Sequence, residues 1–139
     1  MDEPSEQRIG QRGQHNSGCG NQRIGAAGER VAARYLIRVG WSLLDCNWRH
    51  HAAELRGELD IVARDGEAIV FCEVKTRRGE RFGHPAEAVV AAKANRIRSL
   101  GMAWLQQSGL RPEHIRFDVI SVWLPRTGTA HLEHIRAAF

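Results

Sequence analysis

Three acidic side chains and one lysine are spaced so that a single β-hairpin would bring them together. Asp65-Gly66 is a strong turn signal, and strand-like stretches flank it over residues 58–64 and 67–75. A two-residue turn at this point would set Glu58 opposite Glu73 and Asp60 opposite Phe71. Because side chains alternate across a strand, any turn of even length leaves the same set on one sheet face. That set is Glu58, Asp60, Glu73 and Lys75, and the opposite, apolar face is Leu59, Ile61, Ala63, Val70, Cys72 and Val74.

Carboxylates gathered on one face suit a hard divalent cation. Mg²⁺ prefers oxygen ligands and is usually held by one or two carboxylates together with phosphate and water. A lysine beside such a cation can position or deprotonate the attacking water and stabilise charge that develops on a phosphate. The alternative is a cross-strand salt-bridge set in which Lys75 neutralises Glu73 or Glu58. The hairpin alone leaves both interpretations open.

The surrounding pattern predicts an α/β fold with the element order αβββαββ. An amphipathic helix over residues 24–39 ends at Gly40 and carries Glu29 inside its apolar arc, where a carboxylate is costly unless something binds it. A strand over 41–48 leads through a polar connector, residues 49–56, to the hairpin. A basic loop over 76–84 precedes a helix that begins at Pro85 and runs to about residue 107. Strands over 115–124 and 129–135 complete the order.

The composition indicates one globular domain. The chain has 139 residues, of which 42% are hydrophobic and 26% charged. Residues 1–22 are polar and are expected to form a disordered N-terminal tail, with a single domain over 23–139. No apolar run is long enough to span a membrane, and the spacing of the three cysteines matches neither a disulfide framework nor a zinc cluster. We therefore expect a cytoplasmic protein, and we interpret its histidines as surface residues.

The net charge of +4 is concentrated in one segment. Residues 73–98 contain seven basic and three acidic side chains, which accounts for the whole excess. A local basic patch favours a polyanionic partner, and nucleic acid is the commonest one in the cytoplasm. A solvated basic face that helps solubility would give the same pattern, so charge alone does not decide.

Asp60, followed after twelve residues by Glu73-Val74-Lys75, is the D…ExK arrangement of the PD-(D/E)xK nucleases. With Glu29 upstream and a helix on either side, the element order also resembles the core of those enzymes, which include Holliday-junction resolvases. A wider set of motifs over residues 23–139 resembles the YraN-like family, uncharacterised protein family 0102. These motifs include Gly25-Ala-Ala-Gly28-Glu29, Asn47-Trp48-Arg49, Gly57-Glu58-Leu59-Asp60, Glu73-Val74-Lys75-Thr76-Arg77, Lys93 and Arg116-Phe117-Asp118.

The resemblance implies a restriction-endonuclease-like core, in which helices flank a mixed central sheet, and it implies roles for individual residues. The catalytic set would be Glu29, Asp60, Glu73 and Lys75, and Mg²⁺ or Mn²⁺ would be held by Glu29, Asp60, Glu73 and the Val74 carbonyl. The nucleic-acid contacts would be Thr76, Arg77, Arg78, Arg81 and Lys93. Glu58 is a secondary candidate because of its sheet face. Asp118 is another, which either faces the site or pairs with a neighbouring arginine.

Three functions remain open at this level. The first is a metal-dependent nuclease that acts on DNA rather than RNA, with a branched or structured substrate and a homodimeric assembly suggested by analogy with resolvases. The second is a non-catalytic nucleic-acid-binding module that retains the nuclease fold. The third is an interaction module whose hairpin carboxylates form only salt bridges.

Overall fold

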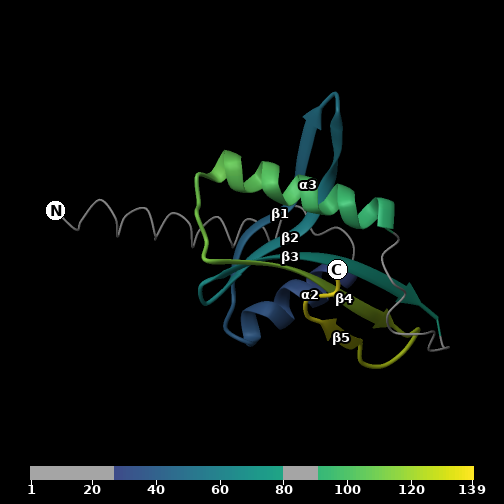
Figure 1. Cartoon of the computed structure of the whole chain (residues 1–139). Helices are drawn as coiled ribbons and strands as arrows, with labels where there is room; N and C mark the ends of the chain where they lie inside the picture. The colour runs from purple at the N-terminus through teal and green to yellow at the C-terminus, as the bar shows by residue number, and fades with distance from the viewer. Residues whose placement is uncertain (1–26, 80–90) are drawn as a thin grey trace.

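The computed structural model describes residues 27–79 and 91–139, which form two helices and five strands (Figure 1). Their order confirms the αβββαββ prediction. The expected tail (1–22), Arg81 and the helix start at Pro85 lie outside the described residues. No helix within the described part of the chain is long and apolar enough to cross a membrane. The elements are α2 (Ala27–Arg38), β1 (Ser42–Ala52), β2 (Leu55–Asp65), β3 (Ala68–Arg78), α3 (Ala91–Ser108), β4 (His114–Leu124) and β5 (His131–Ile135).

The strands form one mixed sheet in the order β1-β2-β3-β4-β5. Strands β1, β2 and β3 are antiparallel neighbours, β4 runs parallel to β3, and β5 returns antiparallel beside β4. A tight turn cannot join parallel neighbours, so the chain crosses from β3 to β4 through α3. The predicted α/β fold with a mixed sheet is confirmed.

The two helices cover opposite faces of the sheet, as Figure 1 shows. Consecutive residues of β3 divide between the two sides. Cys72 packs in the same buried cluster as Leu36 of α2, whereas Phe71 packs in the cluster that contains Leu100 of α3. This alternation is expected of a strand that is buried on both faces.

The register of the β2–β3 hairpin differs from the prediction by two residues. Asp65 pairs with Ala68, so the turn residues are Gly66 and Glu67. Gly66 has a φ of 59°, a left-handed conformation that tight hairpin turns require and that glycine adopts without strain. The predicted pairs Glu58–Glu73 and Asp60–Phe71 are therefore wrong. Because the shift is even, it moves no side chain to the other face of its strand.

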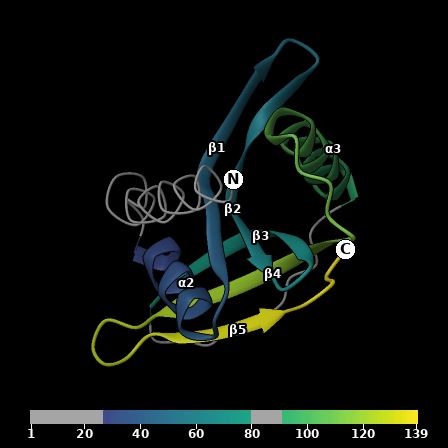
Figure 2. The same cartoon turned by 90° about the vertical axis from the view of Figure 1, so that its left-hand side faces the viewer.

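Residues 49–58 form an arm that projects from the sheet beside α3 (Figure 2). The sequence predicted a polar connector over 49–56, but the chain is paired strand along most of this length. Arg49 pairs with Glu58 and Ala52 with Leu55. The arm is thus a two-stranded extension of β1 and β2, and β2 continues into it without a break.

Strands β1 and β2 bend together at the root of the arm. Cys46 and its partner Ile61 pack in the cluster on the α2 side, whereas the next pair outward, Trp48 and Leu59, packs in the cluster on the α3 side. The sequence predicted that Leu59 and Ile61 share one side of a regular strand, but in the structure they lie on opposite sides of the sheet. Between these two pairs lies Asn47 of β1, which has a φ of 51°.

Candidate metal centre

The central pair of carboxylates lies where β2 leaves β3, a point that we call the fork. The last β2–β3 pair is Ile61 with Cys72, and the next residues along, Asp60 and Glu73, meet just beyond it. Asp60 Oδ2 accepts a hydrogen bond from the Val74 backbone N–H at 2.9 Å. Beyond the last pair, β2 no longer supplies a backbone carbonyl to the Val74 N–H, and the Asp60 carboxylate accepts this hydrogen bond instead.

Asp60 and Glu73 also share a hydrogen bond, and their environment separates their pKa values. Burial, together with the hydrogen bond and charge of Glu73, raises the pKa of Asp60 to about 9. Burial alone would raise the pKa of Glu73 too, but hydrogen bonds from Asp60 and Lys93 and the charge of Lys75 outweigh it, and the pKa of Glu73 is lowered. These opposite directions are those of two carboxyl groups that share a proton, with the neutral form favoured at Asp60 and the ionised form at Glu73.

Two lysines contribute positive charge to this pair. Lys93, in the first turn of α3, places its Nζ 3.0 Å from Glu73 Oε2. The Lys93 side chain is 50% exposed and that of Glu73 only 11%, so the ammonium reaches the carboxylate from solvent. Lys75 lies two residues beyond Glu73 on β3, and its charge helps to lower the pKa of Glu73. Lys93, which the sequence placed among the phosphate contacts, thus contacts the carboxylate pair itself.

Glu29 reaches the cluster from the first turn of α2. Burial and the negative charges of Glu58 and Glu73 raise its pKa, although a hydrogen bond from the Asn47 side chain opposes this. Asn47 can supply that bond because asparagine is one of the few non-glycine residues that adopt a left-handed backbone conformation readily. Sequence reasoning gave Asn47 no role, and only its place in a family motif pointed to it.

The approach of α2 to β3 depends on Gly28. A Cβ atom at this position would overlap Thr76 Oγ1 and lie within 2.9 Å of Thr76 Cγ2 and Cβ. The missing side chain therefore lets the first turn of α2 sit directly on β3. Glu29 follows Gly28 and is carried to the fork by this contact. Thr76, predicted to contact nucleic acid, also has this packing role.

Glu58 belongs electrostatically to the cluster, although it stands on the arm. Its Oε2 lies 3.2 Å from Arg49 Nε, and its charge raises the pKa of Glu29. A shallow depression that is too small to hold a water molecule lies between Glu58 and the fork. It is lined by Glu58, Leu59, Asp60, Phe71, Cys72, Glu73 and Ile97.

The other predicted nucleic-acid contacts follow Lys75 along β3. Strand β3 continues to Arg78 instead of entering a loop at Thr76, as the sequence predicted. Arg77 and Arg78 pair in register with Trp123 and Leu124 of β4, and Arg78 is exposed. Basic residues therefore continue along β3 from Lys75 at the fork to Arg78, near the end of the described segment 27–79.

Asp118 forms an ion pair with Arg116 and does not face the fork. Of the two alternatives predicted for Asp118, the structure therefore has the arginine pair. Asp118 is fully buried beside Cys72 on the α2 side of the sheet. Arg116 Nε donates to it at 2.8 Å, the Ala137 N–H donates at 3.0 Å, and His134 Nε2 lies 2.7 Å away. His134 also contacts the Tyr35 hydroxyl at 2.8 Å and is buried, so the surface interpretation was wrong for this histidine.

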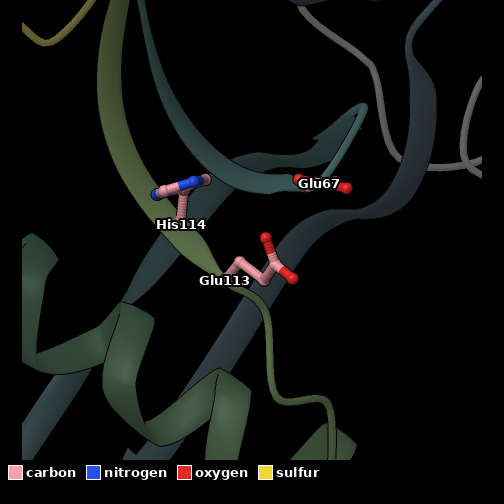
Figure 3. Close-up of side chains that lie close together, drawn as sticks. All are labelled: Glu67, Glu113 and His114. Carbon is pink, nitrogen blue, oxygen red and sulfur yellow. The ribbon is translucent and has the colours of Figure 1, made fainter.

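A separate group of side chains that could ligate a metal lies at the opposite end of the sheet, and among the described residues it is the group of three whose ligand atoms all lie within 4.8 Å of one another. Figure 3 shows Glu67, from the β2–β3 turn, near Glu113 and His114 at the start of β4. All three side chains are exposed. Exposed groups of this kind are common without a bound ion, whereas those at the fork are partly buried and perturb one another's pKa.

The carboxylates around the fork are of the chemical type that a hard divalent cation binds, but their oxygens do not all lie within 4.8 Å of one another as the ligands of one ion would. Asp60, Glu73 and Glu29 offer carboxylate oxygens, the ligands that Mg²⁺ and Mn²⁺ prefer. The raised pKa of Asp60 and the ammonium of Lys93, 3.0 Å from Glu73, both reduce the repulsion between the two carboxyl groups. A divalent cation would supply the same charge with better geometry for several oxygens.

The sequence model of a protein family, described as Uncharacterised protein family UPF0102, matches residues 28–122 of this chain. The chain belongs to the UPF0102 family. A UPF0102 protein of Frankia casuarinae is 53% identical over 116 residues, covering 84% of this chain and 95% of the relative. UPF0102 proteins of Rhodococcus jostii and Streptomyces griseus are 44% and 47% identical, covering 86% and 81% of this chain and 98% and 92% of the relatives. The fork, both lysines and the arm all lie within the matched region.

Proposed function

We propose that this UPF0102 protein is a metal-dependent nuclease that acts on DNA. The observation that carries the proposal is the partly buried, hydrogen-bonded pair of Asp60 and Glu73 at the fork, with Lys75 two residues further on β3. Glu29 adds a third carboxylate from a separate element. Carboxylates that hold a cation next to a lysine can together supply metal-dependent phosphodiester hydrolysis.

Asp60, Glu73 and Glu29 would hold Mg²⁺ or Mn²⁺, which would polarise the phosphodiester and lower the pKa of a bound water. Lys75 would orient the attacking water and stabilise negative charge on a phosphate oxygen. The Val74 carbonyl remains a proposed further ligand. Lys93 stands at the boundary between the carboxylate pair and solvent, where its ammonium can also bind a phosphate group of the substrate.

The charge distribution supports nucleic acid as the substrate. Arg77 and Arg78 extend β3 beyond Lys75, so a phosphate backbone that crosses the fork would meet positive charge on leaving it. A branched or structured DNA and a homodimer remain expectations from the resolvase-like motifs. Sedimentation of the protein alone and with a four-way junction tests the dimer.

Cleavage of a labelled substrate panel tests the proposed activity. The full chain is incubated with single-stranded, duplex, flap and four-way-junction DNA and with matched RNA, in Mg²⁺, Mn²⁺ or EDTA. We expect cleavage only with metal, and a loss of about 10²–10³-fold in Lys75→Ala and Glu73→Gln. Glu67→Gln is the matched control, because it removes an exposed carboxylate at the far end of the sheet.

Each other outcome contradicts the proposal in a defined way. Activity that persists in EDTA or in Lys75→Ala would show that the fork does not perform the reaction. Salt-sensitive binding without cleavage would favour the non-catalytic nucleic-acid-binding module. The absence of both binding and cleavage would favour the interaction module.

A further inference from the structure

One face of the arm is fixed against α3. Gly57 packs so closely that a Cβ atom there would lie 2.8 Å from Leu100 Cδ1. Leu55 packs against the same α3-side cluster, and the Trp48 ring stacks on His50 with 5.3 Å between centroids. The contacts of Gly57 and Leu55 pack this face of the arm against α3.

The other face of the arm, which we call the outer face, carries Arg49, His51, Arg56 and Glu58. Side-chain alternation places these four together, as the cross-strand pairs Arg49–Glu58 and His51–Arg56. The Arg49 side chain is 62% exposed, and His51 and Arg56 are also exposed. Glu58, at the inner end, acts electrostatically on Glu29. The outer face therefore leads from the carboxylate cluster outward to basic groups that are about 7 Å apart along the strand.

We propose that the outer face of the arm binds the phosphate backbone of a double-stranded segment beside the fork, so that the substrate is a nucleic acid with a duplex flank. This inference rests on the proposed function, because the fork and the arm would contact one molecule. Its chemical basis is the exposed Arg49 and Arg56 guanidinium groups, whose planar, two-pronged geometry matches phosphate oxygens.

The dimensions and composition of the arm favour a duplex over a single strand. Phosphate groups follow both edges of each groove of a duplex, so a ribbon whose inner face packs against α3 can present its outer face to a row of them. The four cross-strand pairs from Arg49–Glu58 to Ala52–Leu55 extend about 10 Å. Proteins that bind single strands use exposed aromatic platforms. The outer face, described along its whole length, has no Trp, Tyr or Phe, and Trp48 is turned toward α3.

The test measures binding of the full chain to a blunt duplex and to a single strand of the same length. Fluorescence anisotropy in EDTA prevents cleavage, and the titration is repeated from 50 to 200 mM KCl. For Arg49→Gln/Arg56→Gln we expect weaker duplex binding and a log–log salt slope that is smaller by about 0.9 for each phosphate that the variant no longer neutralises. Single-strand affinity should change less. Arg111→Gln is the control, because Arg111 is exposed at the opposite end of the sheet.

Three outcomes would overturn the inference. These are a duplex salt slope that the double variant leaves unchanged, an equal loss of affinity for both probes, and an equal loss of affinity in Arg111→Gln. A charge reversal, Arg56→Glu, gives a second variant at an exposed position that no core contact depends on. If wild type binds duplex through the arm but never cleaves it, the proposed nuclease activity fails while this inference stands. If it cleaves duplex and the arm variants cleave equally well, the inference alone fails.

Discussion

The carboxylate of Asp60 accepts a hydrogen bond from the backbone N–H of Val74 across the point where β2 separates from β3. One contact therefore serves both the fold and the site. It closes the open end of the β2–β3 pairing, and it fixes the Asp60 carboxyl group beside Glu73. The residue proposed to hold a cation is thus positioned by the backbone of the segment that carries the other carboxylate and Lys75.

Replacing Asp60 by asparagine should separate stability from metal binding. The Asn amide can accept from the Val74 N–H and donate to Glu73 without placing two carboxylates together. We expect Asp60→Asn to match or exceed the thermal stability of the metal-free wild type, and to lose the stabilisation that Mn²⁺ gives. Asp60→Ala leaves the Val74 N–H without its partner and should cost about 1–3 kcal/mol. Equal destabilisation by both variants, in urea unfolding, would contradict this account.

Lys93 should compete with a cation for Glu73. Its Nζ lies 3.0 Å from the Glu73 carboxylate and supplies charge that a metal would otherwise supply. In Lys93→Met, which keeps most of the side-chain length, we expect a less stable metal-free protein and a larger increase in Tm on addition of Mn²⁺. Arg98→Met is the control, because Arg98 lies on α3 and bonds Asn95 rather than the cluster. A smaller Mn²⁺-induced shift than in wild type would show that Lys93 supports metal binding instead.

Asn47 should hold Glu29 in place without touching the metal. Asn47→Gly keeps a residue suited to a φ of 51° and removes only the amide that bonds Glu29. Groups that orient a metal ligand typically contribute about 10–100-fold to affinity. We expect a decrease in this range for Mn²⁺ affinity, measured by calorimetry, with little change in Tm. An affinity equal to that of wild type would exclude Glu29 from the metal centre or Asn47 from its support.

The sequence predicted the sheet faces of the hairpin better than its register. Placing Asp60, Glu73 and Lys75 together required only that the turn contain an even number of residues. The turn could sit at Asp65-Gly66 or at Gly66-Glu67, because Gly66 supplies the left-handed residue in either case. The prediction that these three side chains lie together therefore did not depend on the register, although every predicted cross-strand pair was wrong.

Contacts between distant elements could not be predicted in the same way. The salt bridge between Lys93 and Glu73 depends on how the crossover helix packs, which no local pattern encodes. The sequence did not predict the arm as paired strands, because Gly57, which packs against α3 on its inner face, has no side chain that would contribute to an alternating hydrophobic pattern. The burial of His134 follows from its bond to Asp118 on another strand, so the histidine looked like a surface residue in the sequence.

The contact between Gly28 and Thr76 should control the placement of Glu29. Gly28→Ala introduces a methyl group that overlaps Thr76 Oγ1, so the first turn of α2 must move away from β3. We expect lower stability and weaker Mn²⁺ binding. Thr76→Ala removes the hydroxyl and the methyl group, two of the three atoms nearest to that new Cβ, so the double variant should recover part of both properties. If Thr76→Ala leaves the effects of Gly28→Ala unchanged, the overlap is not their cause.

Asp118 should make the fold sensitive to acid. Burial alone would raise the pKa of Asp118, but hydrogen bonds from His134, Arg116 and the Ala137 N–H outweigh it and lower the pKa. A carboxyl group with a lowered pKa stabilises the fold above the unfolded value, near pH 4, and this contribution disappears as pH falls through the folded value.

Asp118→Asn should cost about 3 kcal/mol at pH 7, because it leaves Arg116 and His134 without their buried partner. Urea unfolding at pH 7, 4 and 2.5 should then show a smaller acid-induced decrease in stability in Asp118→Asn than in wild type. Asp65→Asn, which alters the half-exposed carboxylate on the same arginine, should change this pH dependence much less. Parallel stability curves for wild type and Asp118→Asn would mean that Asp118 does not link folding to protonation.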